Sequence, residues 1–140
     1  PTTFDLESFT VESRTAWFEQ FDLNSRYVCF VAIDQGQVQG YANSSRFRAK
    51  DAYDPSVASS VYLRPEAQGR GLGGRLYGRL FDHLGQRQEV HKIYAAVTLP
   101  NDASIALHEK VGFEPCGLFK EVGFKFDQYW NVQWLEKRAS

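Results

Sequence analysis

The chain is short of the features that identify several large classes of protein. It has 140 residues with two cysteines, and its longest apolar run, Tyr27 to Ile33, is far shorter than a bilayer-spanning helix of about 20 residues. We therefore expect no membrane span. Cys29 and Cys116 lie far apart in the sequence, a spacing that predicts neither a metal site nor a disulfide framework.

Other absences narrow the range of functions that the sequence allows. The net charge is −1 and the basic residues are dispersed, so the sequence lacks the basic patch of a nucleic-acid-binding protein. No charged-then-apolar segment opens the chain, and reduced cysteines fit a cytoplasmic protein. Hydrophobic residues make up 43% and aromatic residues 15%, which excludes a disordered chain. The composition predicts one folded domain over residues 1–140.

Hydrophobic periodicity predicts a mixed α/β sheet. Leucines recur at every fourth position from Leu72 to Leu84, which indicates an amphipathic helix, and Gly36 marks a hairpin turn between two β-like runs. We expect helices over 11–21, 73–86 and 101–111, strands over 27–33, 38–45, 57–63 and 92–99, a loop over 46–55, and two strands around Gly123 between 113 and 136.

Residues 68–74 are the most informative segment, because they read Gln-Gly-Arg-Gly-Leu-Gly-Gly between a predicted strand and a predicted helix. Glycines allow positive φ and close approach of a ligand, while the free N–H groups of the helix start point at one place. The helix N-terminus also favours an anion. The segment therefore predicts a diphosphate site.

Three alternatives to this interpretation are weaker. Gly69 to Gly74 matches G-x-G-x-x-G, but the next predicted strand ends at Leu99 without the acidic residue that a dinucleotide site requires. A Walker loop needs Lys-Ser or Lys-Thr after its last glycine, whereas Arg75 follows here. A turn that only packs helix against strand does not explain four glycines in six positions.

This segment resembles the acetyl-CoA motif of GCN5-related N-acetyltransferases, in which Gln68-x-x-Gly71-x-Gly73 follows the strand SVYL. Three blocks, AYDPSVASSVYLRPEAQGRGLGGRLY, LPNDASIALHEKVGF and VGFKFDQYWNVQW, are similar to the phosphinothricin and methionine sulfoximine acetyltransferase branch. The resemblance implies a mixed, mostly antiparallel twisted sheet flanked by helices. It also implies acetyl-CoA as donor and a small amine, such as an amino acid or analogue, as acceptor.

The resemblance assigns the donor site residue by residue. Backbone amides from Gly69 to Gly74 would hold the coenzyme diphosphate, and Val61 to Leu63 would pair with the pantetheine arm. The residues expected to bind acetyl-CoA are Val61, Tyr62, Leu63, Gln68, Gly69, Arg70, Gly71, Leu72, Gly73, Gly74, Asn101 and Ser104.

The predicted helix over 101–111 supplies candidates for the reaction centre. Asn101 and His108 lie within about 20° of each other on one face, with Ser104 about 60° to the side. Asn101 also suits a helix N-cap, and His108 alone is equally typical of a surface histidine. By resemblance, Asn101 touches the coenzyme arm and His108 lies near the sulfur, as thiolate acid or orienting donor. We expect both to be catalytic.

Ala58 departs from the family pattern. The resembled branch carries a glutamate general base at the second position of a Val-Glu-Ser stretch, which here reads Val57-Ala58-Ser59. Loss of a general base typically costs about 10²- to 10⁴-fold. Three explanations compete: a water chain on strand carbonyls removes the proton, a nearby hydroxyl or carboxylate substitutes, or the protein binds acyl-CoA with little turnover. The first is favoured.

The loop over 47–53 combines aromatic and basic side chains, as an amino-acid-like acceptor requires. By resemblance, Arg48, Lys50 and Tyr53 contact the acceptor, although the two cations stand in the opposite order and are not interchangeable. The stretch after Val122 would add Lys125 and Tyr129. Trp130 and Trp134 are expected in the core.

The N-terminus is shorter than in the resembled family, whose members begin with a strand and a helix before the stretch at Thr2 to Asp5. The chain opens with Pro1 rather than methionine, so either it was processed or the sequence begins inside a longer one. Without those elements the strand over 27–33 becomes an exposed edge. We therefore expect a homodimer or another chain to cover it.

An amine such as a peptide N-terminus is an alternative acceptor.

Overall fold

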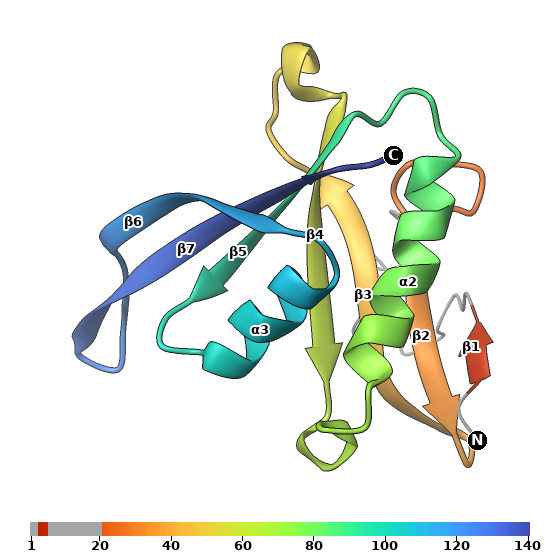
Figure 1. Cartoon of the computed structure of the whole chain (residues 1–140), viewed down its shortest axis with the longest axis horizontal. Helices are drawn as coiled ribbons and strands as arrows, with labels where there is room; N and C mark the ends of the chain where they lie inside the picture. The colour runs from red at the N-terminus through yellow and green to blue at the C-terminus, as the bar shows by residue number, and fades with distance from the viewer. Residues whose placement is uncertain (1–2, 6–20) are drawn as a thin grey trace.

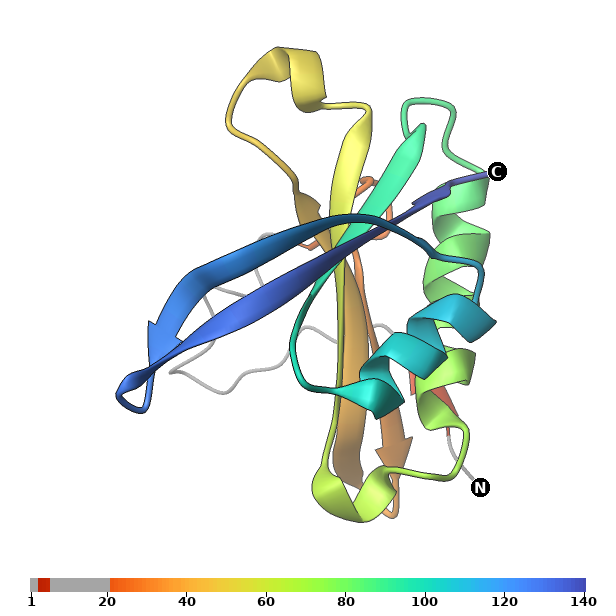
Figure 2. The ribbon, with the colours of Figure 1, turned by 60° about the vertical axis from the view of Figure 1, so that its left-hand side comes forward.

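The computed structural model describes residues 3–5 and 21–140, which form a twisted sheet with helices on one side (Figures 1 and 2). The strands are β1 (Thr3–Asp5), β2 (Cys29–Asp34), β3 (Gln37–Arg46), β4 (Ser56–Leu63), β5 (Lys92–Thr98), β6 (Glu114–Lys125) and β7 (Gln128–Arg138). The helices are α2 (Leu72–Gly85) and α3 (Asp102–Lys110), with the short 3₁₀ helices η2 (Asp51–Tyr53) and η3 (Pro65–Ala67).

The described residues form a seven-stranded sheet in the order β1-β2-β3-β4-β5-β7-β6. Every neighbouring pair is antiparallel except β4 and β5, which run parallel. This arrangement confirms the predicted mixed, mostly antiparallel sheet flanked by helices. No helix in the described ranges is long and apolar enough to cross a membrane.

The parallel pair at the centre of the sheet is short. Ser56 to Ala58 pair with Lys92 to Tyr94, and beyond that point no further β4–β5 pairing is formed by the described residues. Strand β3 continues to pair with β4 as far as Leu63, so β4 keeps one neighbour and loses the other. Figure 1 shows the two strands diverging from this point. The sheet is therefore split between β4 and β5.

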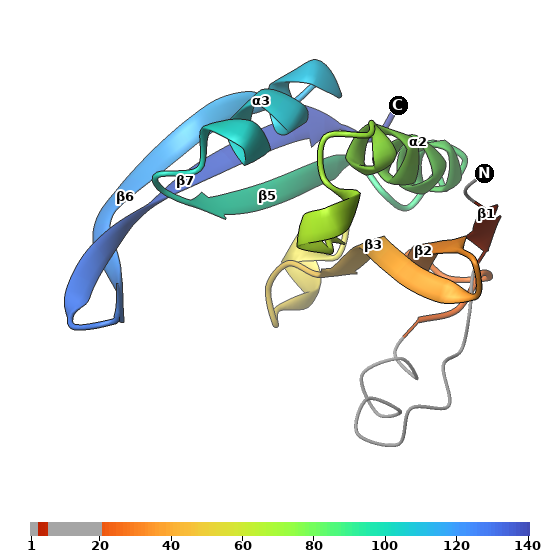
Figure 3. The ribbon, with the colours of Figure 1, turned by 90° about the horizontal axis from the view of Figure 1, so that it is seen from below.

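Helix α2 covers the sheet through the leucine stripe that the sequence predicted. Leu76, Leu80 and Leu84 are fully buried, and they pack in one core with Val57 of β4 and Ile93 of β5. Side chains alternate along a strand, so one face of β4 meets α2 while the other faces away. Figure 3 shows α2 and α3 together on one side of the sheet.

Most predicted elements of the described range are present within a few residues of their expected bounds. The hairpin turn after Asp34 is formed by Gln35 and Gly36, both with positive φ. The expected helix over 11–21 lies almost wholly outside the described residues. The predicted loop over 46–55 contains η2, a single 3₁₀ turn.

Two expectations about the strands are wrong. The last hairpin turns at Phe126 and Asp127, with φ of 55° and 58°, and not at Gly123, which lies inside β6 beside a shift of register. The strand over 27–33 is not the edge, because β1 pairs with β2 through Val31 to Ile33. The N-terminal segment of the same chain thus covers part of β2.

Replacing Leu80 by alanine tests the packing of α2. We expect a loss of about 2–5 kcal/mol in the free energy of unfolding, because the side chain is fully buried and leaves a cavity. Leu118, whose side chain is 44% exposed, is the control, and Leu118→Ala should change stability by less than about 1 kcal/mol. Urea denaturation measures both; equal losses would contradict the proposed core.

Candidate active site

A cavity of about 470 Å³ opens where β4 has lost its second neighbour. Its walls come from the end of β4, from the glycine turn that leads into α2, and from α3. The lining residues are Val61, Tyr62, Leu63, Gln68, Gly69, Gly71, Gly73, Gly74, Asn101, Ala103, Ser104, Leu107 and Lys110.

The glycine turn is shaped by left-handed backbone. Gly69 has φ of 79°, and Gly71, the N-cap of α2, has φ of 76°, a region that side chains with a Cβ rarely adopt. No acidic side chain lies in the first turn of α2. The first amides of a helix lack intrahelical acceptors and carry partial positive charge, so this wall of the cavity suits an anion.

Helix α3 begins at the cavity with a side-chain cap. The Oδ1 atom of Asn101 accepts a hydrogen bond from the backbone N–H of Ser104 at 3.1 Å, which confirms the predicted N-cap. Asn101 and Ser104 both line the cavity, and so does the ammonium-bearing Lys110 at the other end of the helix.

His108 does not line the cavity, which corrects the expectation that all three polar groups of α3 face the same space. Its side chain is buried, with the residue 4% exposed, and its ring packs on Tyr77 and Phe113. Nδ1 lies 2.7 Å from the carbonyl oxygen of Ser104, and Nε2 lies 2.8 Å from the hydroxyl of Tyr77. The surface-histidine alternative is equally wrong.

These contacts fix the proton positions on the ring. A carbonyl oxygen only accepts, so Nδ1 carries the hydrogen, and Nε2 accepts from the Tyr77 hydroxyl. The Tyr77 oxygen lies 3.3 Å from the hydroxyl of Ser59, which donates to it in turn. Burial lowers the pKa of His108, partly offset by the Ser104 carbonyl, and burial raises the pKa of Tyr77. Both shifts favour the neutral form of the side chain.

Most residues expected to bind the donor line the cavity. The exceptions are Arg70, whose side chain is exposed, and Leu72, whose side chain is buried in the protein interior; both were expected to contribute through backbone amides. The sequence interpretation missed Ala103, Leu107 and Lys110. Ala103, Leu107 and Lys110 follow one another at intervals of four and three residues, which places them on one helix face, and this spacing was the available signal.

Ala58 lies on the opposite face of the sheet from α2, beside the split. It faces Ser45 of β3 on one side and Tyr94 of β5 on the other. Phe47 stacks on Tyr94 with ring centroids 4.6 Å apart, and Trp134 of β7 meets Phe47 edge-on at 6.0 Å. An aromatic wall thus stands next to the position where the resembled family has its glutamate.

The loop between β3 and β4 brings cations to this wall. The Arg48 guanidinium lies 4.5 Å from the Phe47 ring centroid and 6.0 Å from that of Trp134, both within cation–π range. Tyr53, which is 45% exposed, meets Phe47 at 6.4 Å. Lys50 is exposed at the start of η2.

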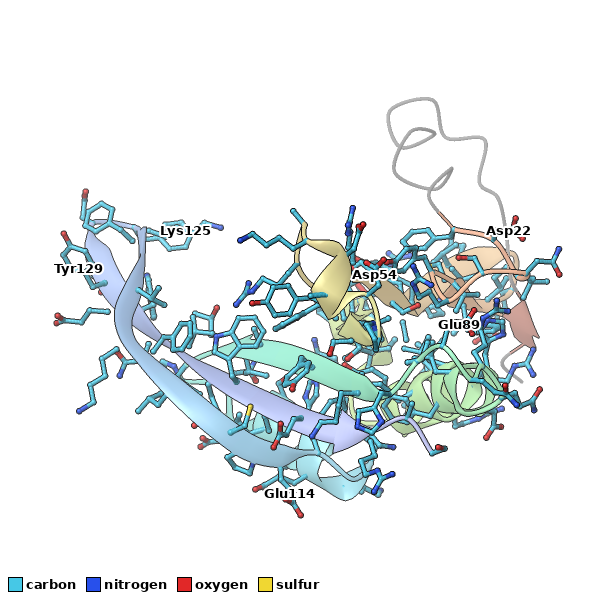
Figure 4. The ribbon with its side chains drawn as sticks, turned by 90° about the horizontal axis from the view of Figure 1, so that it is seen from above. Asp22, Asp54, Glu89, Glu114, Lys125 and Tyr129 are labelled. Carbon is cyan, nitrogen blue, oxygen red and sulfur yellow. The ribbon has the colours of Figure 1, made fainter. Side chains whose placement is uncertain are left out.

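The β6–β7 hairpin extends on the same side of the sheet as this loop (Figure 3). Lys125 lines a second cavity of about 480 Å³ with residues that include Thr98 and Trp130. Figure 4 shows Lys125 on the side of the hairpin that faces the loop, and Tyr129 on its outer side. Tyr129 is 62% exposed and does not line this cavity.

The two tryptophans of β7 correct another expectation. Trp130 and Trp134 are only partly buried and neither belongs to the core cluster. Trp134 contributes to the aromatic wall, and its indole nitrogen is buried without a hydrogen-bond partner among the described residues. Among those same residues no group of His, Cys, Asp and Glu side chains is arranged to hold a metal ion.

Comparison with known proteins identifies the family. The model of the acetyltransferase (GNAT) family matches residues 2–113, most of the chain. The chain belongs to this family. This GNAT chain is 45% identical over 139 residues to the phosphinothricin N-acetyltransferase of Streptomyces coelicolor, covering 98% of the chain and 81% of that protein.

Two further relatives agree with this assignment. The L-methionine sulfoximine/L-methionine sulfone acetyltransferase of Salmonella typhimurium is 34% identical, over 89% of this GNAT chain and 72% of its own. The crystal structure of a phosphinothricin acetyltransferase from Sinorhizobium meliloti in complex with acetyl-CoA superposes with a TM-score of 0.80. It is 32% identical and covers 91% of this chain and 68% of that one.

Substitution of Gly71 tests the geometry of the glycine turn. We expect Gly71→Ala to lower the free energy of unfolding by about 1–2 kcal/mol, because alanine is strained at φ of 76°. Gly78 is the matched control: it is helical, and an added Cβ meets nothing within 4 Å. Gly78→Ala should stabilise the protein by up to about 1 kcal/mol. If thermal or urea unfolding showed that both variants change the free energy of unfolding in the same direction, the left-handed geometry of this turn would be contradicted.

Proposed function

We propose that this protein transfers the acetyl group of acetyl-CoA to the amine of a small acceptor by direct attack in a ternary complex. The acceptor class is an amino acid or an analogue of the phosphinothricin or methionine sulfoximine type. The observation that carries the proposal is the split between β4 and β5, which has a cavity on its helix side and cations with aromatic rings on its other side. Residues 1–140 act as one acyl-CoA N-acyltransferase domain.

The cavity on the helix side is the proposed donor site. Its glycine turn offers amides from Gly69 to Gly74 to the diphosphate, and Lys110 adds a positive charge. The unpaired edge of Val61 to Leu63 offers backbone groups to the pantetheine arm, as a neighbouring strand would. Asn101 and Ser104 lie on the opposite wall, beside the arm. The acetyl-CoA bound to the Sinorhizobium meliloti relative supports this assignment.

The other side of the split is the proposed acceptor site. The aromatic wall of Phe47, Tyr94 and Trp134 suits the apolar part of an amino-acid-like molecule. Its acid groups require cations, which Arg48 and Lys50 supply from the loop. The hairpin residues Lys125 and Tyr129, and Tyr53 from η2, are proposed to complete this site.

The reaction requires a neutral amine. The amine nitrogen attacks the thioester carbonyl carbon, the C–N bond forms, and the C–S bond breaks to release the coenzyme thiolate. A thiol has an ordinary pKa of about 8.5, so the thiolate leaves readily near neutral pH. The proton of the amine passes through water to solvent, because Ala58 has no group that accepts it.

Two alternatives have support from particular features. A peptide N-terminus, with an ordinary pKa of about 7.7–8.0, is more often neutral and so depends less on a base. Ala58 in place of a glutamate favours a protein that binds acyl-CoA with little turnover. The second alternative is a binding protein and not an enzyme. Only an enzyme releases thiol when an amine is added.

An assay of free thiol separates these functions. With acetyl-CoA and a panel of amino acids, we expect amine-dependent thiol release whose rate at saturating acceptor rises steeply from about pH 6 to 9, since solvent supplies the free amine. Ala58→Glu should raise the rate near pH 7 by about tenfold or more and flatten the profile.

Ala106→Glu is the control, because it adds the same charge on the exposed side of α3. It should leave the profile unchanged. A flat profile of the parent between those pH values would overturn the water route. Coenzyme binding without thiol release, seen as stabilisation of about 2.7 kcal/mol at a hundredfold excess over Kd, would favour the binding protein.

We also propose that the protein forms a homodimer in the cytoplasm. The β6–β7 hairpin exposes several large apolar side chains, among them Phe124 at 61%, Phe126 at 80% and Val122 at 56%. Large apolar side chains exposed together on one hairpin favour an interface there. Cys29 and Cys116 are both free thiols, which supports a reducing compartment.

Sedimentation tests the dimer. The parent should sediment at twice the chain mass of 16.0 kDa, and Phe126→Asp should shift it towards the monomer because a charge is placed in the apolar patch. Leu23→Asp changes another exposed apolar side chain, at 49%, away from the hairpin and should leave the dimer intact. A parent that sediments as a monomer at micromolar concentration would refute the proposal.

A further inference from the structure

A buried chain of polar groups joins the three walls of the donor cavity. Ser59 belongs to β4, Tyr77 to α2 and His108 to α3, and successive side chains lie 3.3 Å and 2.8 Å apart. The His108 ring then returns to its own helix at the carbonyl oxygen of Ser104, 2.7 Å away. Ser59 and His108 are 6% and 4% exposed, and Tyr77 is fully buried.

The two rings of this chain are also fixed by packing. The Tyr77 ring stacks on Phe81 with centroids 4.9 Å apart, and the His108 ring meets both Tyr77 and Phe113. The hydroxyl of Tyr77 is the only group joined to both of the other links among the described hydrogen bonds. Buried polar groups that lose a partner are destabilised, so the chain constrains the spacing of β4, α2 and α3.

The same geometry argues against His108 as the proton donor to the leaving thiolate. In the neutral form that burial favours, its one N–H is donated to the Ser104 carbonyl, and the ring does not line the cavity. Giving up that hydrogen would leave an imidazolate unless Tyr77 passed its own proton to Nε2. Tyr77 is buried, which disfavours the tyrosinate that this step would create.

We propose that Tyr77 is a positioning residue, which through Ser59 and His108 holds β4, α2 and α3 at the spacing that acetyl-CoA requires, and that His108 acts by position and not by proton transfer. This inference rests on the proposed function for its ligand. Ser104 and Asn101 are the cavity residues on α3 that the chain keeps in place against Val61 to Leu63.

Tyr77→Phe removes the central hydroxyl and keeps the stacked ring. We expect the Kd for coenzyme A, measured by calorimetry, to rise roughly tenfold, with a matching rise in KM for acetyl-CoA and little change in kcat. Ser59→Ala removes the outer link with less disturbance of the core and should act in the same direction. Tyr27→Phe, just before β2 and absent from the cavity lining, is the control and should bind coenzyme A as the parent does.

His108→Gln separates position from proton transfer. Glutamine can donate to the Ser104 carbonyl and accept from Tyr77, but it does not exchange protons between about pH 6 and 9. We expect kcat within roughly tenfold of the parent and a pH profile of the same shape. A loss of roughly 10²-fold or more, with one limb of the profile removed, would overturn the positional role.

The binding measurement keeps this inference distinct from the proposed function. If no amine is acetylated but Tyr77→Phe still weakens coenzyme binding, acetyl transfer fails and the positioning role stands. If the parent acetylates amines and both Tyr77→Phe and Ser59→Ala bind coenzyme A as the parent does, the positioning role is wrong. Circular dichroism of each variant shows whether it is folded. If Tyr77→Phe does not fold, coenzyme binding by Ser59→Ala tests the positioning role.

Discussion

The structure depends on one interrupted contact, the parallel pairing of β4 and β5 that ends at Ala58 and Tyr94. A strand that loses one neighbour exposes backbone donors and acceptors, which in a buried sheet need new partners. Here the loss coincides with the cavity lined by Val61 to Leu63. In the proposed function, this divergence is the place where a donor on one face of the sheet and an acceptor on the other meet.

The walls around this opening are held by different kinds of interaction. The glycine turn owes its shape to the left-handed backbone of Gly69 and Gly71. The chain from Ser59 through Tyr77 to His108 ties β4 to both helices. On the opposite face, the loop is held by Phe47 against Tyr94 and by the ion pairs of Asp54 with Arg26 and Arg46, at 3.7 Å and 3.6 Å. These partly exposed pairs are individually weak.

Features encoded by neighbouring residues could be predicted from the sequence, and features that depend on tertiary contacts could not. The leucine period of α2, the glycine turn and the Asn101 cap are local, and each was found as expected. The direction of His108 depends on Tyr77, which is 31 positions away in the sequence. A tyrosine on the apolar face of a helix needs a buried partner for its hydroxyl, and that requirement was the missed signal. The turn at Phe126 and Asp127 contains none of the glycine or asparagine that usually marks such a turn.

The proposed donor and acceptor sites lie on opposite faces of one sheet. Residues that select the acceptor can therefore change while the residues that hold acetyl-CoA stay the same. The acceptor face is built by a surface loop and a hairpin, neither of which contributes a lining residue to the glycine-turn cavity. Such segments tolerate change better than the packed helices do. A lineage carrying this scaffold is therefore free to explore new amines by altering Arg48, Tyr53 or Lys125 while its acyl donor remains the same. Diversity of substrates among relatives is a natural outcome of that separation.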